Sequence, residues 1–268
     1  MAVRWEWIAF GYFVYLLIVA LTDKRFIRAR VGTFVGTVVC GAVLGSQLVP
    51  WLRIDALTFA ILVPLPMLLA GYRLSGLFFV SPMRDAEEWL MALDRRFLRR
   101  QGILAAYETS PRMVHESLEL AYVLVYLVIP AGVATLAMGG HPEVIPRFWT
   151  IVLLAAFISY GVMPWLQTRP PRVLENTPDM IEPQSALRRF NATILNRGSI
   201  QANTVPSGHA ASAVATGLAV ADAMPLAGAV FLFTAACIVV ATVLGRYHYL
   251  LDSLLGIVVA VVAWCICR

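Results

Sequence analysis

The chain has 268 residues, of which 60% are hydrophobic and 14% are charged, and its mean hydropathy is +0.76. A soluble domain has about half apolar and about a quarter charged residues, so this composition excludes an ordinary soluble protein and indicates several membrane spans. The net charge of +5 does not argue for a nucleic-acid partner, because basic loops are common beside anionic lipid headgroups. We therefore expect an all-α polytopic helix bundle in a membrane bilayer, with no nucleic acid among its partners.

Eight apolar segments are predicted to span the bilayer, each close to the length that the hydrocarbon core requires. Their approximate ranges are 7–22, 31–50, 54–72, 117–138, 148–166, 207–222, 225–244 and 249–267. The first segment lacks a convincing small-residue cleavage site, so we expect a retained helix and not a removed signal peptide. Residues 1–53 would carry extra N-terminal membrane helices, and residues 54–268 a membrane domain with a six-helix core.

Two connections between the predicted spans are long. Residues 81–116 mix large apolar side chains with dense charge, a pattern typical of an amphipathic helix in the membrane interface, and we interpret them as scaffold. The other connection, 167–206, leads into the stretch NTVPSGHAAS. Its five arginines are Arg169, Arg172, Arg188, Arg189 and Arg197.

Two of the four histidines, His209 and His248, lie at the start of a predicted span. His248 and Asp252 are four residues apart, so in a helix they share one face. The carboxylate could then hold one imidazole nitrogen as a donor and leave the other with its lone pair, which a histidine nucleophile requires. Ionisable residues at membrane depth are costly, and this cost favours a functional role for both.

His209 follows Pro206, Ser207 and Gly208. We expect the sixth span to begin near Pro206, because proline suits the first helical turn. The free amides from Ser207 onward and the Ser207 hydroxyl would then form an anion site, and Gly208 would let the backbone approach a phosphate closely. His209, when protonated, could donate to a leaving oxygen.

PSGH, followed about forty residues later by HYLLD, resembles the second and third signature motifs of the type 2 phosphatidic acid phosphatase superfamily. The resemblance implies that His248 attacks phosphorus and forms a phosphohistidine, that Asp252 orients it, and that His209 protonates the leaving alcohol. No metal or other cofactor is needed in that family. Residues 54–268 would be the phosphatidic acid phosphatase-like membrane domain, and Ser207 and Gly208 would contact the substrate phosphate.

The chain departs from the family pattern at two positions. The first signature reads Lys, six residues, then Arg-Pro; here the arginine is Arg169, but Val162 stands at the lysine position. In the third motif Thr242 replaces an arginine six residues before the histidine, and Arg246 is a candidate to substitute for it. We expect Arg169, Arg246 and Arg172 to bind phosphate. The departures resemble the branch that contains inositol phosphorylceramide synthases and sphingomyelin synthases.

These motifs leave hydrolysis and transfer open, because water or a lipid alcohol can resolve the same intermediate. We expect a phosphatase acting on a lipid phosphate or diphosphate; the alternatives are a lipid phosphotransferase and a non-catalytic lipid-binding or transport protein. Most of the 21 Lys and Arg share one predicted side of the cell membrane with both histidine motifs, which predicts a cytoplasmic site. Relatives by resemblance mostly work on the periplasmic or lumenal face, so the side stays open, as do the lipid and the oligomeric state.

Overall fold

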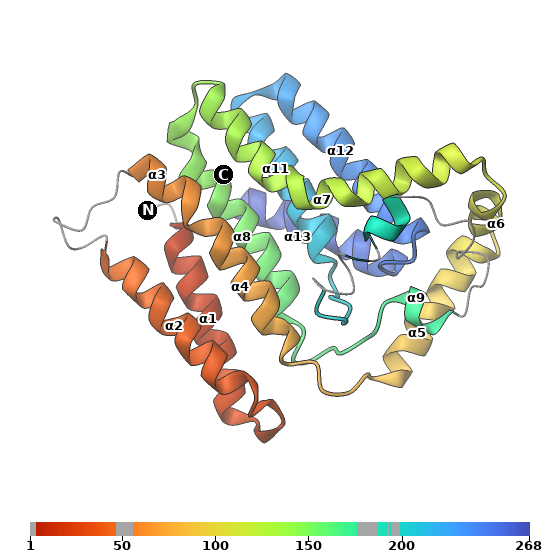
Figure 1. The fold of residues 1–268 in the computed structure, drawn as a ribbon, viewed down its shortest axis with the longest axis horizontal. Coiled ribbons are helices and arrows are strands. Elements are labelled where there is room, and N and C mark those ends of the chain that lie inside the picture. The colour runs from red at the N-terminus through yellow and green to blue at the C-terminus, as the bar shows by residue number, and fades with distance from the viewer. Residues whose placement is uncertain (1–3, 47–55, 176–186, 192, 194–198) are drawn as a thin grey trace.

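The computed structural model describes residues 4–46, 56–175, 187–191, 193 and 199–268. Every regular element within these ranges is a helix, and Figure 1 shows the long helices packed side by side. The α-helices are α1 (Trp5–Thr22), α2 (Ala29–Ser46), α3 (Ala56–Leu62), α4 (Pro64–Gly76), α5 (Arg84–Asp94), α6 (Ile103–Glu108), α7 (Arg112–Met138), α8 (Ile145–Gly161), α9 (Pro171–Leu174), α11 (Gly208–Ala223), α12 (Pro225–Leu244) and α13 (Leu250–Ile266). The predicted all-α class is confirmed.

Within the residues that the structure describes, six helical segments have the length and hydropathy of membrane spans. They are Trp5–Thr22, Ala29–Ser46, Leu57–Gly76, Arg112–Met138, Pro142–Gly161 and Pro225–Leu244. The sixth and eighth predicted spans correspond to shorter helices, α11 with 16 residues and α13 with 17. Six apolar helices of spanning length indicate a multi-pass membrane protein.

The third predicted span is divided within its sequence. α3 ends at Leu62, and α4 begins at Pro64. Proline has no N–H to continue the helical hydrogen bonding and suits a first helical turn, so it ends one helix and starts the next. α4 then packs against α8, and its side chains line a cavity together with His209.

Helix α11 lies at the centre of the bundle, where it packs against α7, α8, α12 and α13 (Figure 1). Its buried positions are mostly alanine, glycine, serine and threonine, and small residues let neighbouring helices approach closely. Gly256 of α13 makes the closest approach possible, because a Cβ there would lie 2.6 Å from the backbone oxygen of Ser207. The first turn of α11 is therefore fixed against the first turns of α13.

The N-terminal helices belong to the same bundle. α1 packs against α8 as well as against α2. Tyr12 of α1 stacks on Phe157 of α8 with ring centroids 4.1 Å apart, and its hydroxyl donates to the Gly71 carbonyl of α4. This packing connects α1 and α2 to the helices that surround the histidines.

Residues 81–116 fold into α5, a short π-helical stretch (Arg95–Arg99), α6 and the first turn of α7. The buried residues Glu87, Leu90, Asp94 and Leu98 recur at helical spacing on one face of this segment. The segment is amphipathic as predicted, but its buried face includes two carboxylates. Its location in the membrane interface stays a prediction.

The sixth span starts near Pro206 as expected, two residues after it. Ser207 has an extended backbone, and α11 begins at Gly208. The Ser207 side chain accepts a hydrogen bond from the Ala210 amide and so caps the helix. Serine is a favoured N-cap residue, and Pro206 lies directly before it, outside the helix.

Candidate active site

The structure brings His209 and His248 into direct contact. His209 lies in the first turn of α11, and His248 lies in the connection between α12 and α13. Nδ1 of His209 is 3.1 Å from Nε2 of His248, and the ring centroids are 5.2 Å apart. One of these two nitrogens must donate a proton and the other accept it.

The tight turn after α12 places His248 opposite α11. Arg246 adopts a left-handed backbone conformation with a φ of 59°, which reverses the chain. The amides of Tyr247 and His248 both donate to the Thr242 carbonyl at 2.9 Å. These hydrogen bonds satisfy a backbone carbonyl at the C-terminal end of α12, and they hold the backbone of His248 in place before α13 begins.

Asp252 lies directly behind His248. Its Oδ2 is 3.5 Å from Nδ1 of His248, an ion-pair distance. The same oxygen accepts hydrogen bonds from the Asn203 side chain at 2.8 Å and from the Tyr249 amide at 3.0 Å. Asp252 is thus the third residue of α13, accepts from the amide of the N-cap residue Tyr249, and lies beside the His248 ring at the same time.

His248 is buried, with only 4% of its surface exposed. Burial and the positive charge of Arg172 lower the pKa of His248 to about 3. The imidazole is therefore neutral near pH 7. A proton on Nδ1, toward Asp252, leaves the lone pair of Nε2 directed at His209.

Ser207 and Gly208 join the start of α11 to its neighbours. Ser207 is fully buried, and its amide donates to the Asp252 carbonyl at 2.9 Å. The Gly208 amide donates to the Thr204 hydroxyl at 3.1 Å. A Cβ at position 208 would collide with the Tyr160 ring, so only glycine fits there. Both residues lie beside His209, and their contact with a phosphate stays a prediction.

Arg169 and Arg246 are held by carboxylates. Arg169 forms a two-pronged ion pair with Glu87 of α5, with Nη2 2.8 Å from Oε2. The buried Arg246 pairs with Asp94 of α5 at 2.7 Å and with Glu175 at 2.8 Å. Although burial opposes ionisation, the hydrogen bonds from Arg169 hold the pKa of Glu87 below its usual range. Both arginines thus connect α5 to the site, and their role as phosphate ligands stays a prediction.

Arg172 differs from Arg169 and Arg246 in the contacts that its guanidinium makes. Its guanidinium lies over the ring of Tyr247, 5.3 Å from the centroid, and its amide donates to the Arg246 carbonyl. Within the part of the chain that the structure describes, its guanidinium forms no ion pair. Its positive charge disfavours the protonated form of His248, and this effect adds to that of burial in lowering the pKa of His248.

An aromatic wall, formed by Tyr122, Tyr126 and Tyr247, encloses His209. Tyr122 and Tyr126 of α7 lie 5.6 and 6.5 Å from His209 between ring centroids. Tyr247 stacks on Tyr122 at 3.8 Å, and its hydroxyl donates to Glu119 at 2.7 Å. This wall was not predicted from the sequence, although the four-residue spacing of Tyr122 and Tyr126 already puts them on one helical face.

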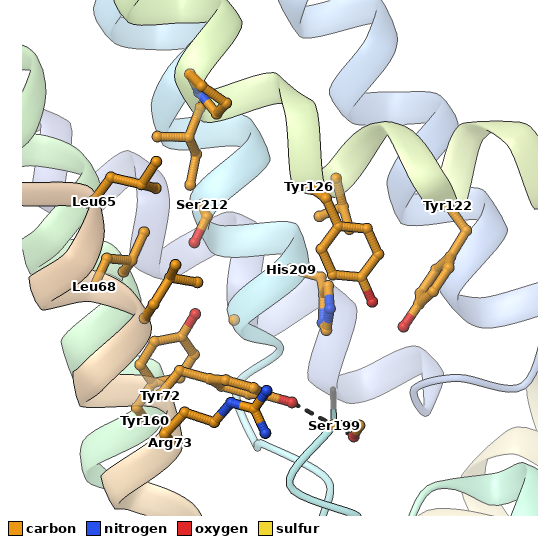
Figure 2. Close-up of a pocket in the computed structure, with 15 residues that line it drawn as sticks. Leu65, Leu68, Tyr72, Arg73, Tyr122, Tyr126, Tyr160, Ser199, His209 and Ser212 are labelled. Carbon is orange, nitrogen blue, oxygen red and sulfur yellow. Dashed lines mark hydrogen bonds between the residues drawn. The ribbon is translucent and has the colours of Figure 1, made fainter. Parts of the chain in front are cut away.

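A cavity of about 280 Å³ opens beside His209. Figure 2 shows side chains from α4, α7, α8 and α11 around it, with His209 and the two tyrosines of α7 on one side and the leucines of α4 on the other. Among the described residues, no group of three or more His, Cys, Asp or Glu side chains could hold a metal ion. Of the two contacting histidines, His209 lines this cavity, and Arg73 is the cation among its lining residues.

Asp94 should be essential for holding the turn that carries His248. Its Oδ2 pairs with Arg246 and its Oδ1 accepts the Leu250 amide at 3.0 Å, so it contacts both arms of the turn. Breaking a buried ion pair costs about 3 kcal/mol or more, because the remaining charge is left unpaired. We expect Asp94→Ala to lower the midpoint of thermal unfolding of the purified protein in detergent. Asp85→Ala, an exposed position on the same helix, is the control, and equal midpoints for the two variants would contradict this role.

Residues 88–266 match the family model described as the PAP2 superfamily. The match covers more than half of the chain and includes both histidines, Asp252 and the three candidate arginines. It begins within α5, after the four N-terminal α-helices. No curated protein and no solved structure matches the chain significantly.

Proposed function

Because the chain belongs to the PAP2 superfamily, which supports phosphatase-type activity on phosphate substrates, we propose that it is a lipid phosphate phosphatase of the cell membrane that acts through a phosphohistidine. The observation that carries this proposal is the contact of 3.1 Å between His209 and His248. In the proposed mechanism His248 is neutral with its lone pair on Nε2, and His209 takes up a proton when an anionic phosphate binds. This is the arrangement that nucleophilic attack with acid assistance requires.

In the first half-reaction, Nε2 of His248 attacks phosphorus and forms the P–N bond. The bond from phosphorus to the alcohol oxygen breaks, and His209 donates its proton to that oxygen. A distance of 3.1 Å leaves no space for phosphorus between the rings, so the two imidazoles must separate when substrate binds. The negative charge of the phosphate would favour the protonated form of His209.

In the second half-reaction, water attacks the phosphohistidine while His209 takes up a proton from it. Phosphate leaves, and His248 regains its lone pair. Asp252, fixed by Asn203 and the Tyr249 amide, would stabilise the positive charge that His248 carries in both steps. Asn203 thus becomes a positioning residue for the nucleophile.

The phosphate would bind among cations and the start of α11. Arg172 is available in the conformation described, because its guanidinium lies over Tyr247 and near the histidine pair. Arg169 and Arg246 would reach phosphate oxygens only by giving up part of their bonding to Glu87, Asp94 and Glu175. Ser207 and Gly208 would contribute through the first turn of α11, where backbone amides favour anions.

Transfer to a lipid alcohol is the second candidate, and the surroundings of Thr242 favour it. Thr242 stands where the family motif usually has an arginine, and it is fully buried with its hydroxyl 3.2 Å from that of Ser253. The chain therefore has a buried hydroxyl where the family motif usually has a guanidinium. The departure is the one that resembles the inositol phosphorylceramide and sphingomyelin synthase branch.

The test is an assay of the purified protein with radiolabelled phosphatidic acid, a polyprenyl diphosphate and a phosphoinositide, each with and without an added lipid alcohol. We expect phosphate release that does not depend on the acceptor. A labelled lipid product that forms only with the acceptor would make the protein a phosphotransferase. Absence of product from every donor would favour a non-catalytic lipid-binding or transport protein.

A further inference from the structure

The cavity beside His209 has an apolar part and a polar part. The apolar part is lined by Leu65, Leu68 and Leu69 of α4 and by Val125, Ile129 and Pro130 of α7. The polar part contains Tyr72, Arg73, Ser199 and His209. Figure 2 shows the Arg73 side chain at this polar end, close to the hydrogen bond between Tyr72 and Ser199. An amphipathic cavity of this kind fits a lipid with an anionic headgroup.

Of the two histidines, His209 lines the cavity and His248 does not. In phosphoryl transfer the attacking and leaving atoms lie roughly in line on opposite sides of phosphorus. If His248 attacks, the leaving oxygen is on the His209 side, where the cavity is. The apolar group in the cavity is then attached to the leaving oxygen.

We propose that this cavity binds the first part of the hydrocarbon chain of the leaving lipid alcohol, with Arg73 contacting the anionic phosphate at its polar end. The inference rests on the proposed function, since it uses the roles of His209 and His248 given there. It also means that an accepting alcohol would use the same cavity, because the second half-reaction reverses the geometry of the first.

The size of the cavity and its rim fit one chain segment. About 280 Å³ is just below the range of roughly 300–1,000 Å³ for pockets that enclose a small ligand. Leu69 and Tyr126 line the cavity but are 56% and 42% exposed, so the rim between α4 and α7 faces outward. The headgroup end of a chain would be enclosed, and the rest would extend past Leu69 into the bilayer.

Arg73 has the properties of a headgroup ligand. It is exposed, lines the cavity and forms no ion pair with any residue in the described ranges. A guanidinium binds phosphate oxygens through two parallel hydrogen bonds. α4, which carries Arg73 and the three leucines, lies outside the matched residues 88–266, so this wall is not part of the family match.

Photo-crosslinking tests the site without relying on turnover. The probe is a phosphonate analogue of phosphatidic acid, which cannot be hydrolysed, with a diazirine near the carboxyl end of one acyl chain. We expect labelled peptides from residues 65–73 and 122–130 of the wild-type protein. Leu69→Trp should remove most of this label, whereas Leu62→Trp, an exposed position outside the cavity, should not. Label on other helices, or equal labelling of both variants, would overturn the proposal.

Kinetics supply the second readout. We expect Arg73→Gln to raise KM for phosphatidic acid about tenfold with little change in kcat, because a charge-assisted contact is lost in the bound state. Arg73→Lys should recover part of the affinity, and Arg28→Gln, an exposed arginine outside the cavity, should leave KM unchanged. An unchanged KM in Arg73→Gln would remove the headgroup role. Crosslinking in the cavity without any turnover would instead contradict the proposed function and leave the lipid site standing.

Discussion

Replacing His248 with alanine should reduce phosphate release by a factor on the order of 10⁴ or more, because the proposed covalent intermediate forms on its imidazole. Nε2 of His248 lies 3.1 Å from the second histidine, and Oδ2 of Asp252 lies 3.5 Å from its Nδ1. The measurement is the initial rate of phosphate release from labelled phosphatidic acid by the purified variant. Thermal unfolding in the same detergent shows whether the variant is folded.

His141→Ala is the matched control for this variant. His141 lies in the connection between α7 and α8, and its imidazole pairs with Glu143, away from the cavity. We expect its rate to equal that of the wild type. A folded His248→Ala protein that retained more than a few per cent of the wild-type rate would contradict a nucleophilic role for His248.

Replacing His209 with asparagine should slow hydrolysis of an alkyl phosphate by about 10²–10⁴, the usual contribution of a general acid. The same variant should lose much less activity toward an aryl phosphate with an acidic phenol, because a phenolate can leave without a proton. The measurement is the ratio of kcat/KM for phosphatidic acid to that for p-nitrophenyl phosphate. Asparagine keeps a polar side chain of similar size at the start of α11.

The two histidine variants should respond differently to the leaving group. His248→Ala should lose activity toward both substrates, since both need the P–N bond. His209→Asn should lose activity mainly toward the alkyl ester. If His209→Asn lost equal activity toward the two substrates, this would contradict the assignment of His209 as the general acid.

The sequence predicted the features that depend on local pattern. The apolar runs predicted the spanning helices, and six helical segments have the required length. The PSGH and HYLLD motifs identified two histidines 39 residues apart in sequence that contact each other in the structure. His209 lies at the start of α11 and His248 in the turn before α13, and the backbone at such positions depends on neighbouring residues in the sequence. Short motifs therefore predict where these residues lie.

Contacts over long distances in the sequence were not predictable in this way. Arg169 and Glu87 are separated by 82 residues, and Arg246 and Asp94 by 152, so no spacing rule relates them. One signal was present, because Glu87 and Asp94 occupy the apolar face of α5 together with Leu90. A carboxylate on an apolar face needs a cation partner, and the site arginines were the available ones.

The cavity could not be predicted because it depends on how α4 packs against the rest of the bundle. The leucines of α4 were predicted as part of an ordinary membrane span, and nothing in their spacing separates a lipid-facing surface from a cavity wall. The start of α11 illustrates a smaller limit. Pro206 and Ser207 both favour a helix start, and only the hydrogen bond from the Ala210 amide shows that Ser207 is the cap.

In the proposed mechanism, His248 carries the phosphoryl group between the two half-reactions. The most direct measurement is to mix the protein with phosphatidic acid labelled in its phosphate, stop the reaction in alkali within the first turnover, and map the labelled peptide by mass spectrometry. Phosphohistidine survives alkali and is lost in acid, so we expect an acid-labile label on the peptide that contains His248, accumulating further when hydrolysis is slowed. Label on another residue, or steady turnover with no labelled peptide at any time, would contradict the mechanism.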